Sequence, residues 1–472
     1  MAQTFFFYDL ETSGLDARSQ RIMQFAGQRT DMDLQPVGEP VNLLVCLSDD
    51  ILPEPSAIMV TGITPQKTLE EGISEPEFVK ILSEQVFTPD TIIVGFNNIR
   101  FDDEFVRFAL WRNFYDPYEW CYKDGRSRWD MLDVVRMTRA LRPDSIVWPV
   151  DKKGQPTNRL EELATANHFD HTHAHDALSD VMATIQLAQL IKQKQPKLFD
   201  YLLDLRHKAK VSQLVNLDHP EPFVYSSGRY GKDKSFTTIG LPIAPASRDG
   251  GVVIYDLSVN PEPFFELNDS QLKEKLFASY EQRTQPDFVG LPVKELFYNK
   301  APAVAPISVM NDVSWQRLGL DKAAVMKHAG TLAQHADFAQ KLASVYRQKP
   351  AFAANADVEG QLYDGFTNDT DKPRLAVIQA ADAKTLADFN PDFKDKRLGE
   401  LFVRYKARNF PQALSEDEQQ TWEAHRSQKF AQAGPRFMQD LQKLAAQSVG
   451  DENTQFLIEE LRLWCESVAP LE

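Results

Sequence analysis

The sequence predicts an α/β domain with a mixed sheet, then a β-rich segment, then an all-α C-terminal segment. Over residues 1–195, apolar runs typical of buried strands alternate with amphipathic runs typical of helices. The strand-like runs are FFFYDLE, NLLVCL and TIIVGFN, and the helix-like runs are EPEFVKILSEQV, DVVRMTRAL and ALSDVMATIQLAQLIKQ. This alternation is typical of an α/β domain.

The pattern changes twice further along the chain. Residues 196–349 contain short β-type runs broken by Gly, Pro and Asn, as in a small barrel: EPFVYSS, SFTTIGLPIA, GGVVIYDLS and PVKELFYNK. Residues 352–472 contain the long amphipathic runs PRFMQDLQKLAAQ and TQFLIEELRLWCESV, which predict helices. The sequence therefore predicts three domains, at 1–195, 196–349 and 352–472.

Composition indicates an ordinary globular protein. The chain has 472 residues, of which 43% are hydrophobic and 25% charged. It has no apolar run of membrane-spanning length, and its first residues lack the pattern of a signal peptide. The three cysteines have no CxxC spacing, which indicates neither a zinc site nor a disulfide framework. We therefore expect a cytoplasmic protein with no membrane partner.

The charge of the chain is an argument against a nucleic-acid partner. The formal net charge is -16 and the pI is about 5.1, whereas phosphate binding usually requires a basic surface. A DNA-binding protein of this composition must gather its Arg and Lys along one track, or change the local sign with bound metal ions.

Two acids stand at the end of the first predicted strand. Asp9 and Glu11 are two residues apart, so their side chains lie on the same face of the strand, and Thr12, Ser13 and Gly14 then turn the chain. Neighbouring carboxylates repel each other unless a cation lies between them, and oxygen ligands suit Mg²⁺ or Mn²⁺. The alternative is a solvated turn in which the acids cap the next element.

More acids follow in two later motifs. Asp102 and Asp103 come after the strand TIIVGFN, where a helix N-cap is the alternative role. His175 precedes Asp180 by five residues, which on a helix would place them about 140° apart. They converge only if His175 lies in the loop before the helix and Asp180 on its first turns. By spacing alone, Asp176 is the better partner of Asp180 on one helical face, but we interpret Asp176 as the cap of that helix.

The order of these motifs resembles the DEDDh family of 3'→5' exonucleases. The motifs are DLETSGL, VTGITP, NNIRFD, RLEELA and HDALSD. The four acids of the family match Asp9, Glu11, Asp102 and Asp180, and its histidine matches His175. Further stretches, including RNFYDPYEW, SRWDMLDV and DKRLGELFVRYKARNFP, extend the resemblance over nearly the whole chain to a bacterial group that degrades single-stranded DNA.

The resemblance implies a fold and an activity. The fold is a ribonuclease-H-like exonuclease domain, an SH3-like barrel and a helical domain. The activity is processive removal of 5'-mononucleotides from the 3' end of single-stranded DNA, in DNA repair and recombination. Two Mg²⁺ ions, or Mn²⁺, would be held by Asp9, Glu11, Asp102 and Asp180, with His175 as the general base, in a monomeric protein.

A sequence-independent grip on DNA requires aromatic and basic side chains. The resemblance implies that Glu11 contacts substrate, and it indicates five further contacts, which could instead be core aromatics and surface ion pairs: Arg107, Tyr118, Tyr122, Arg136 and Arg159. A second contact could come from YSSGRYGKDKSF, which contains Arg229, Tyr230, Lys232 and Lys234. The run RYKARNFP is either another contact or an interdomain ion-pair network.

The resemblance also implies a protein partner. Related exonucleases bind the acidic C-terminal tail of the single-strand DNA-binding protein, and Arg142 and Tyr201 match positions of that pocket. The nearby run PAVAPISVMND lacks the polar and basic residues expected there.

Three other functions compete with this interpretation. An exonuclease that trims RNA or proofreads a polymerase shares the motifs, but a proofreading subunit normally has only a short tail after its nuclease domain, and here residues 196–472 follow. A non-catalytic DNA-binding relative would lack one of the acids, and none is missing. A phosphatase could use the same acids on small substrates.

Overall fold

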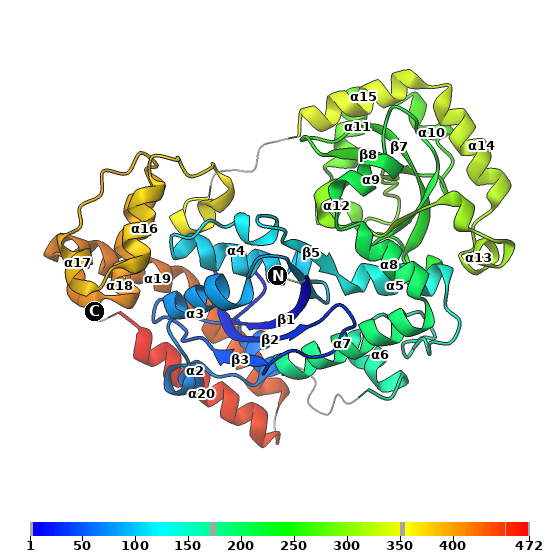
Figure 1. Ribbon diagram of the computed structural model, residues 1–472. Helices are drawn as coiled ribbons and strands as arrows, with labels where there is room; N and C mark the ends of the chain where they lie inside the picture. Colours follow the sequence, from blue (N-terminus) through cyan, green and yellow to red (C-terminus); the bar gives the residue numbers. More distant parts are fainter. Residues whose placement is uncertain (1–2, 170–175, 350–354, 449, 471–472) are drawn as a thin grey trace. The chain divides into compact units, whose positions relative to one another are not determined.

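The computed structural model describes residues 3–169, 176–349, 355–448 and 450–470 (Figure 1). Its contacts divide the chain into two compact units. Unit 1 comprises Met1–Ser127, Thr172–Met182 and Ala353–Glu472, and unit 2 comprises Arg128–His171 and Ala183–Phe352. In the described part of the chain, none of the helices combines the length and the apolar character needed to cross a membrane.

Unit 1 contains the mixed sheet that the sequence predicts. Strands β3 (Val41–Leu44), β2 (Ile22–Thr30), β1 (Thr4–Thr12) and β4 (Thr91–Gly95) are neighbours in that order. The central strand β1 pairs antiparallel with β2 and parallel with β4. Because β1 and β4 are parallel, the segments that follow them leave the sheet at the same edge.

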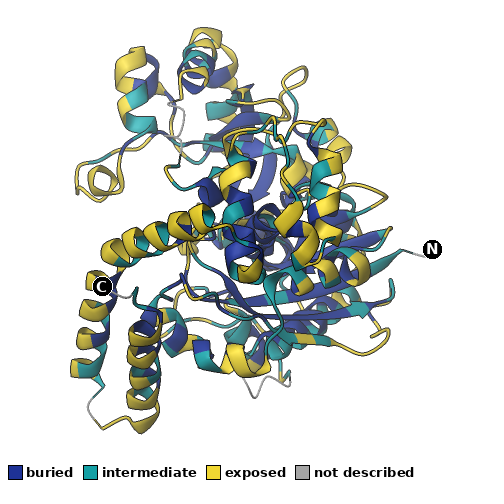
Figure 2. Cartoon of the chain, turned by 90° about the vertical axis from the view of Figure 1, so that its left-hand side faces the viewer, coloured by how far each residue is buried: buried dark blue, intermediate teal, exposed yellow. Residues whose placement is uncertain are grey.

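Helices cover the sheet of unit 1. They are α1 (Pro55–Thr61), α2 (Pro65–Glu71), α3 (Glu75–Ile81) and α4 (Asp102–Arg112). The start of α7 (Ala177–Lys194) also belongs to this unit. Phe6, Tyr8 and Leu10 of β1 pack in one apolar cluster with residues of α3 and α4. Figure 2 shows the buried residues gathered in the strands and the exposed residues on the outer sides of the helices.

The C-terminal helices belong to the same unit. They are α16 (Lys372–Ala380), α17 (Ala383–Asp388), α18 (Arg397–Asn409), α19 (Glu416–Gln447) and α20 (Glu452–Val468). Leu398, Leu401 and Phe402 of α18 join the cluster on the sheet. In a second cluster, Phe437 and Leu441 of α19 pack with residues of α1 and α20.

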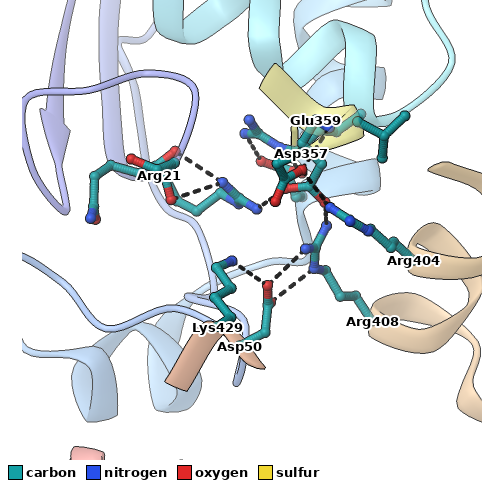
Figure 3. A network of polar contacts seen from close by, with 12 residues as sticks. Arg21, Asp50, Asp357, Glu359, Arg404, Arg408 and Lys429 are labelled. Carbon is teal, nitrogen blue, oxygen red and sulfur yellow. Dashed lines mark hydrogen bonds and ion pairs between the residues drawn. The ribbon is translucent and has the colours of Figure 1, made fainter. Parts of the chain in front are cut away.

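A buried ion network also joins these helices to the N-terminal part of unit 1 (Figure 3). Arg408 of α18 pairs with Glu359 and, at 2.8 Å, with Asp50. Arg21 reaches Glu359 at 2.5 Å, and Lys429 of α19 reaches Asp50 at 2.7 Å. Asp50 therefore has two basic partners, and Glu359 has three because Arg404 also reaches it at 3.9 Å.

Unit 2 is built on a five-stranded antiparallel sheet, in the order β10-β6-β7-β8-β9. Its strands are β6 (Phe223–Ser226), β7 (Thr237–Pro245), β8 (Gly251–Asp256), β9 (Val293–Phe297) and β10 (Val304–Pro306). Its helices are α5 (Met131–Leu141), α6 (Leu160–Ala166), α8 (Pro196–Asp204), α9 (Lys208–Leu214), α10 (Glu262–Phe265), α11 (Asp269–Leu276), α12 (Tyr280–Arg283), α13 (Asp312–Arg317), α14 (Lys322–Ala333) and α15 (Ala336–Arg347). Strand β5 (Ser127–Asp130) spans the border of the two units.

The predicted elements are confirmed, and several further elements were not predicted. The three predicted strands of the first domain are β1, β3 and β4, and its three predicted helices begin within two residues of α3, α5 and α7. Strand β2 was not predicted, because its Gln24, Gln28 and Arg29 interrupt any apolar run. The helices of residues 196–349, such as α14 and α15, were not predicted either.

Candidate active site

Three acids from two elements meet at one edge of the sheet of unit 1. Asp9 and Glu11 lie near the end of β1, and Asp180 lies in the first turn of α7. One carboxylate oxygen from each of the three lies within 4.8 Å of the other two. The strand alternation that places Asp9 and Glu11 on one face thus brings them to a common partner, Asp180.

Asp102 approaches the same place from β4. It is the first residue of α4, is 4% exposed, and lies outside the 4.8 Å set. The residue at the N-cap position is Phe101, with no side-chain cap, so neither Asp102 nor Asp103 has the capping role that was the alternative. The side chain of Asp103 instead accepts hydrogen bonds from the Tyr8 hydroxyl at 2.6 Å and from Asn98 at 3.2 Å.

The start of α7 agrees with the sequence prediction. Asp176 caps the helix, because its Oδ2 accepts the backbone N–H of Ser179 at 3.2 Å. Asp180 follows in the first turn, as the convergence with His175 requires. His175 itself lies outside the described residues.

The electrostatics of the cluster favour a bound cation. Burial, and then the charges of Asp102, Asp180, Glu11 and Asp176, hold the pKa of Asp9 well above its ordinary value. Burial, Asp180, Asp102 and Asp176 raise the pKa of Glu11 to about 8. A divalent cation among these oxygens would remove the repulsion, and an all-carboxylate donor set suits a hard cation. The residues therefore fit a divalent metal site.

Beside α4, aromatic rings and one arginine form a cluster that we call the aromatic patch: Arg107, Tyr118, Tyr363 and Phe366. The Arg107 guanidinium lies 5.6 Å from the centre of the Tyr118 ring and donates to the Tyr363 hydroxyl at 3.3 Å. The Tyr118 and Phe366 rings are 5.8 Å apart, and Phe366 is 86% exposed. Tyr122 is also exposed, at 63%.

Sequence reasoning missed Tyr363 and Phe366. The only signal was a pair of aromatic residues in the polar run GQLYDGFTND, far from the other motifs. The structure places this pair against Tyr118, which the sequence had singled out.

The remaining DNA-contact candidates lie in unit 2. The Arg136 guanidinium is mostly buried, pairs with Asp133 at 2.6 Å and lies over the Phe236 ring, whereas the Arg159 side chain is 73% exposed. Arg229 is exposed, but Tyr230 is buried against Tyr225, so it presents no free ring to solvent.

The other basic residues near Arg229 have partners within unit 2. Lys232 pairs with Asp151 at 2.8 Å, and Lys234 donates to the Ser258 hydroxyl at 2.8 Å.

The partner-site candidates also lie in unit 2. The Arg142 guanidinium donates to the carbonyls of Leu141 at 2.7 Å and of Val309 at 3.5 Å. Tyr201 is partly buried on α8, and burial raises the pKa of its hydroxyl to about 12.

The run RYKARNFP is an ion-pair network, which was one of the two alternatives. Arg404 pairs with Asp357 and Glu400 at 2.5 Å, and Lys406 pairs with Glu418 at 2.6 Å. The side chains of Arg404, Lys406 and Arg408 are only 6%, 4% and 8% exposed. They are therefore not available as a DNA-binding surface.

A carboxylate cluster at the edge of a mixed α/β sheet is typical of metal-dependent hydrolases of phosphate esters, which include phosphatases and nucleases. Comparison with known proteins shows to which family within this class the chain belongs. Residues 6–188 match a family model described as Exonuclease, residues 206–348 the Exonuclease I SH3-like domain, and residues 356–468 the Exonuclease I C-terminal domain. The chain belongs to the exodeoxyribonuclease I family and is an exonuclease.

Individual relatives cover almost the whole chain. Exodeoxyribonuclease I of Haemophilus influenzae is 38% identical over 93% of this chain and 93% of that protein. The Escherichia coli protein of the same name is 36% identical over 98% of both. The crystal structure of E. coli exonuclease I in complex with a dA16 oligonucleotide has a TM-score of 0.94 and 36% identity, covering 99% of this chain and 100% of that one.

These matches confirm the predicted fold class. An α/β exonuclease domain with a mixed sheet is followed by an SH3-like domain and then by a helical C-terminal domain.

Proposed function

We propose that this exonuclease degrades single-stranded DNA from its 3' end and releases 5'-mononucleotides processively, in DNA repair and recombination. The observation that carries the proposal is the convergence of Asp9, Glu11 and Asp180 within 4.8 Å in a chain of this family. Structures of the E. coli relative with single-stranded oligonucleotides support the choice of substrate.

The cofactor we propose is Mg²⁺, two ions per site, with Mn²⁺ as the alternative. Asp9, Glu11, Asp102 and Asp180 would hold the ions through oxygen alone, which is the donor set that Mg²⁺ prefers. Zinc-bound and metal-free forms of the E. coli relative support a divalent metal in this family. When bound, the metal would activate water and stabilise charge on the phosphate.

The chain's own groups supply the rest of the chemistry. The four acids would orient the reacting phosphate by holding the metal ions that contact it. His175 would accept the proton of the attacking water, a role that suits histidine because the unperturbed pKa of this side chain is about 6.5. The rigid strand β1 keeps the acids in place during successive cleavages, because its side chains are fixed by the core beneath it.

Single-stranded DNA would be gripped by stacking and by phosphate contacts. In unit 1 the rings of Phe366 and Tyr122 are exposed and could stack on bases, and the Tyr118 ring, which contacts Arg107, packs against Phe366. Glu11 would contact the terminal nucleotide. In unit 2, the side chain of Arg159 is far more accessible than that of Arg136.

We also propose a partner, an assembly state and a location. Arg142 and Tyr201 would bind the acidic tail of the single-strand DNA-binding protein, and a structure described as SSB/Exonuclease I of a relative at 34% identity supports this. The protein would act as a monomer in the cytoplasm. The three-domain division at 1–195, 196–349 and 352–472 also remains a proposal, and the matched family ranges support it.

The function is tested by single-turnover cleavage in Mg²⁺ of single-stranded DNA with a blocked 3' or 5' end, of duplex DNA and of RNA. We expect rapid release of mononucleotides from single-stranded DNA with a free 3' end, and little cleavage of 3'-blocked DNA, duplex DNA or RNA. Equal degradation of RNA and DNA would contradict the assignment and favour an RNA-trimming enzyme.

The same assay includes two variants. Asp9→Asn should be inactive, which excludes a contaminating nuclease. His175→Ala should bind DNA and metal almost normally but cleave far more slowly, because it lacks only the proton acceptor. Equal loss of binding and cleavage would remove His175 from that role.

A further inference from the structure

Gln24 lies beside the acids without being one of them. It is on β2, directly opposite Glu11 in the β1–β2 register, so the two side chains lie on the same face of the sheet. Its side chain is buried, with 7% of the residue exposed. A buried amide must find hydrogen-bond partners, and those of Gln24 lie on a helix rather than only within the sheet.

Two of the three hydrogen-bond partners of Gln24 are at the start of α7, and the third is on β3. Its Nε2 donates to Oδ1 of Asp176 at 3.2 Å and to Oδ1 of Asn42 at 3.0 Å, and its Oε1 accepts the backbone N–H of Ala177 at 3.5 Å. Asp176 accepts the N–H of Ser179 through its other carboxylate oxygen. The side chain of Gln24 is therefore tied to both the cap and the first residue of α7.

Asp180 depends on that first turn. Its backbone N–H donates to the carbonyl of Asp176 at 3.1 Å, so its position follows that of the capped turn. One oxygen of its carboxylate lies within 4.8 Å of oxygens of Asp9 and Glu11, so a shift of this turn would separate the three acids. The hydrogen bonds from Gln24 on the neighbouring strand form a tether that opposes such a shift.

We propose that Gln24 is a positioning residue of the exonuclease reaction: it holds the first turn of α7, and with it Asp180, in register with the acids of β1. This inference rests on the proposed function for its consequence in catalysis. The effect of Gln24 on metal binding can be measured without catalysis, because side chains that orient metal ligands control how well the metal binds.

Gln28 provides a matched control on the same strand. It lies four residues from Gln24 and is 3% exposed, and within the described part of the chain its amide donates only to the backbone carbonyls of Arg29, Val37 and Gly38. Gln28→Met removes a buried amide of the same kind that contacts no acidic side chain among the described residues. It therefore measures the purely structural cost of the substitution.

The experiment compares Gln24→Met with Gln28→Met. Binding of Mn²⁺ to the full-length protein without DNA is measured by calorimetry, and kcat and KM are measured on single-stranded DNA. We expect Gln24→Met to weaken Mn²⁺ binding by about 10-fold or more and to lower kcat with KM unchanged. Gln28→Met should bind Mn²⁺ as the wild type does. Equal Mn²⁺ affinity and equal kcat in the two variants would overturn the proposal.

A double-mutant cycle identifies the tether itself. If Gln24 acts through Asp176, then Gln24→Met combined with Asp176→Ala should weaken Mn²⁺ binding no further than the stronger single change. Asp176→Asn keeps an oxygen acceptor and a capping side chain, and should retain more Mn²⁺ affinity than Asp176→Ala. Additive losses would contradict the tether.

Failure of the proposed function gives a different result. A wild-type protein that binds Mn²⁺ but does not degrade single-stranded DNA would overturn the function, while the comparison of Mn²⁺ affinities would still test the tether.

Discussion

Asp9 and Glu11 show how a single strand prepares a metal site. Their carboxylates share one face of β1 near its end, and burial and neighbouring acids raise the pKa values of both. In the absence of a cation, Glu11 therefore holds a proton at a pH where an ordinary glutamate has lost it. Binding of a metal ion at this site would therefore displace the proton of Glu11.

This exchange predicts how the stability of the metal-free protein depends on pH. The pKa of Glu11 is raised from 4.5 to about 8 in the folded state. Between these values the unfolded chain has lost the proton that the folded protein keeps, so this group's contribution to stability declines as the pH rises towards 8. Glu11→Gln removes that contribution.

The measurement is the melting temperature in EDTA, for the wild type and Glu11→Gln. The melting temperature of the variant should rise relative to that of the wild type as the pH increases from about 5.5 to about 8.5, because only the wild type must bury a new charge. Saturating Mg²⁺ should make this difference in melting temperature smaller. A difference that stays constant over this range would contradict the raised pKa.

At the scale of elements, a hydrogen bond between Tyr8 of β1 and Asp103 of α4 links this helix to the sheet. The Tyr8 hydroxyl donates to Asp103 at 2.6 Å, and Asp103 is fully buried. Because Tyr8 points to the opposite face from Asp9, this bond joins β1 to the first turn of α4 through the core.

Tyr8→Phe should therefore loosen the start of α4. Loss of a hydrogen bond to a buried carboxylate costs about 1.5–3 kcal/mol. The measurements are the urea midpoint and amide hydrogen exchange in α4, with Tyr115→Phe as the control, since the Tyr115 hydroxyl donates to no described residue. Equal exchange in the two variants would show that the Tyr8 bond does not hold the helix.

At the scale of the whole molecule, the ion network of Figure 3 connects helices α18 and α19 to the N-terminal part of unit 1. Burial alone would raise the pKa values of Asp50 and Glu359, but Arg408 and its basic neighbours outweigh burial and hold both well below their ordinary range. Such acids contribute stability at neutral pH that is lost on acidification.

Arg408→Met should destabilise unit 1 by about 3–5 kcal/mol, because it leaves two buried acids with fewer partners. Urea unfolding followed by circular dichroism measures this loss. Arg462→Met on α20, which removes only exposed pairs with Glu459 and Glu466, is the control and should leave the midpoint unchanged. A similar midpoint in both variants would contradict a structural role for the network.

The sequence by itself determined the local features of the site. Strand alternation placed Asp9 and Glu11 on one face, and the helical run that contains Asp180 placed it in a first turn after a cap at Asp176. Both features follow from the short repeats of side-chain direction in a strand and in a helix, which can be recognised within a few consecutive residues. The ordered motifs also identified the family.

Only the tertiary structure decided which distant segments meet. It placed β2 beside β1, so that Gln24 lies opposite Glu11, and it brought Tyr363 and Phe366 against Tyr118. It also decided that the basic residues of RYKARNFP are buried in ion pairs. Such pairings arise from packing between segments far apart in the chain, and no local period of the sequence records them.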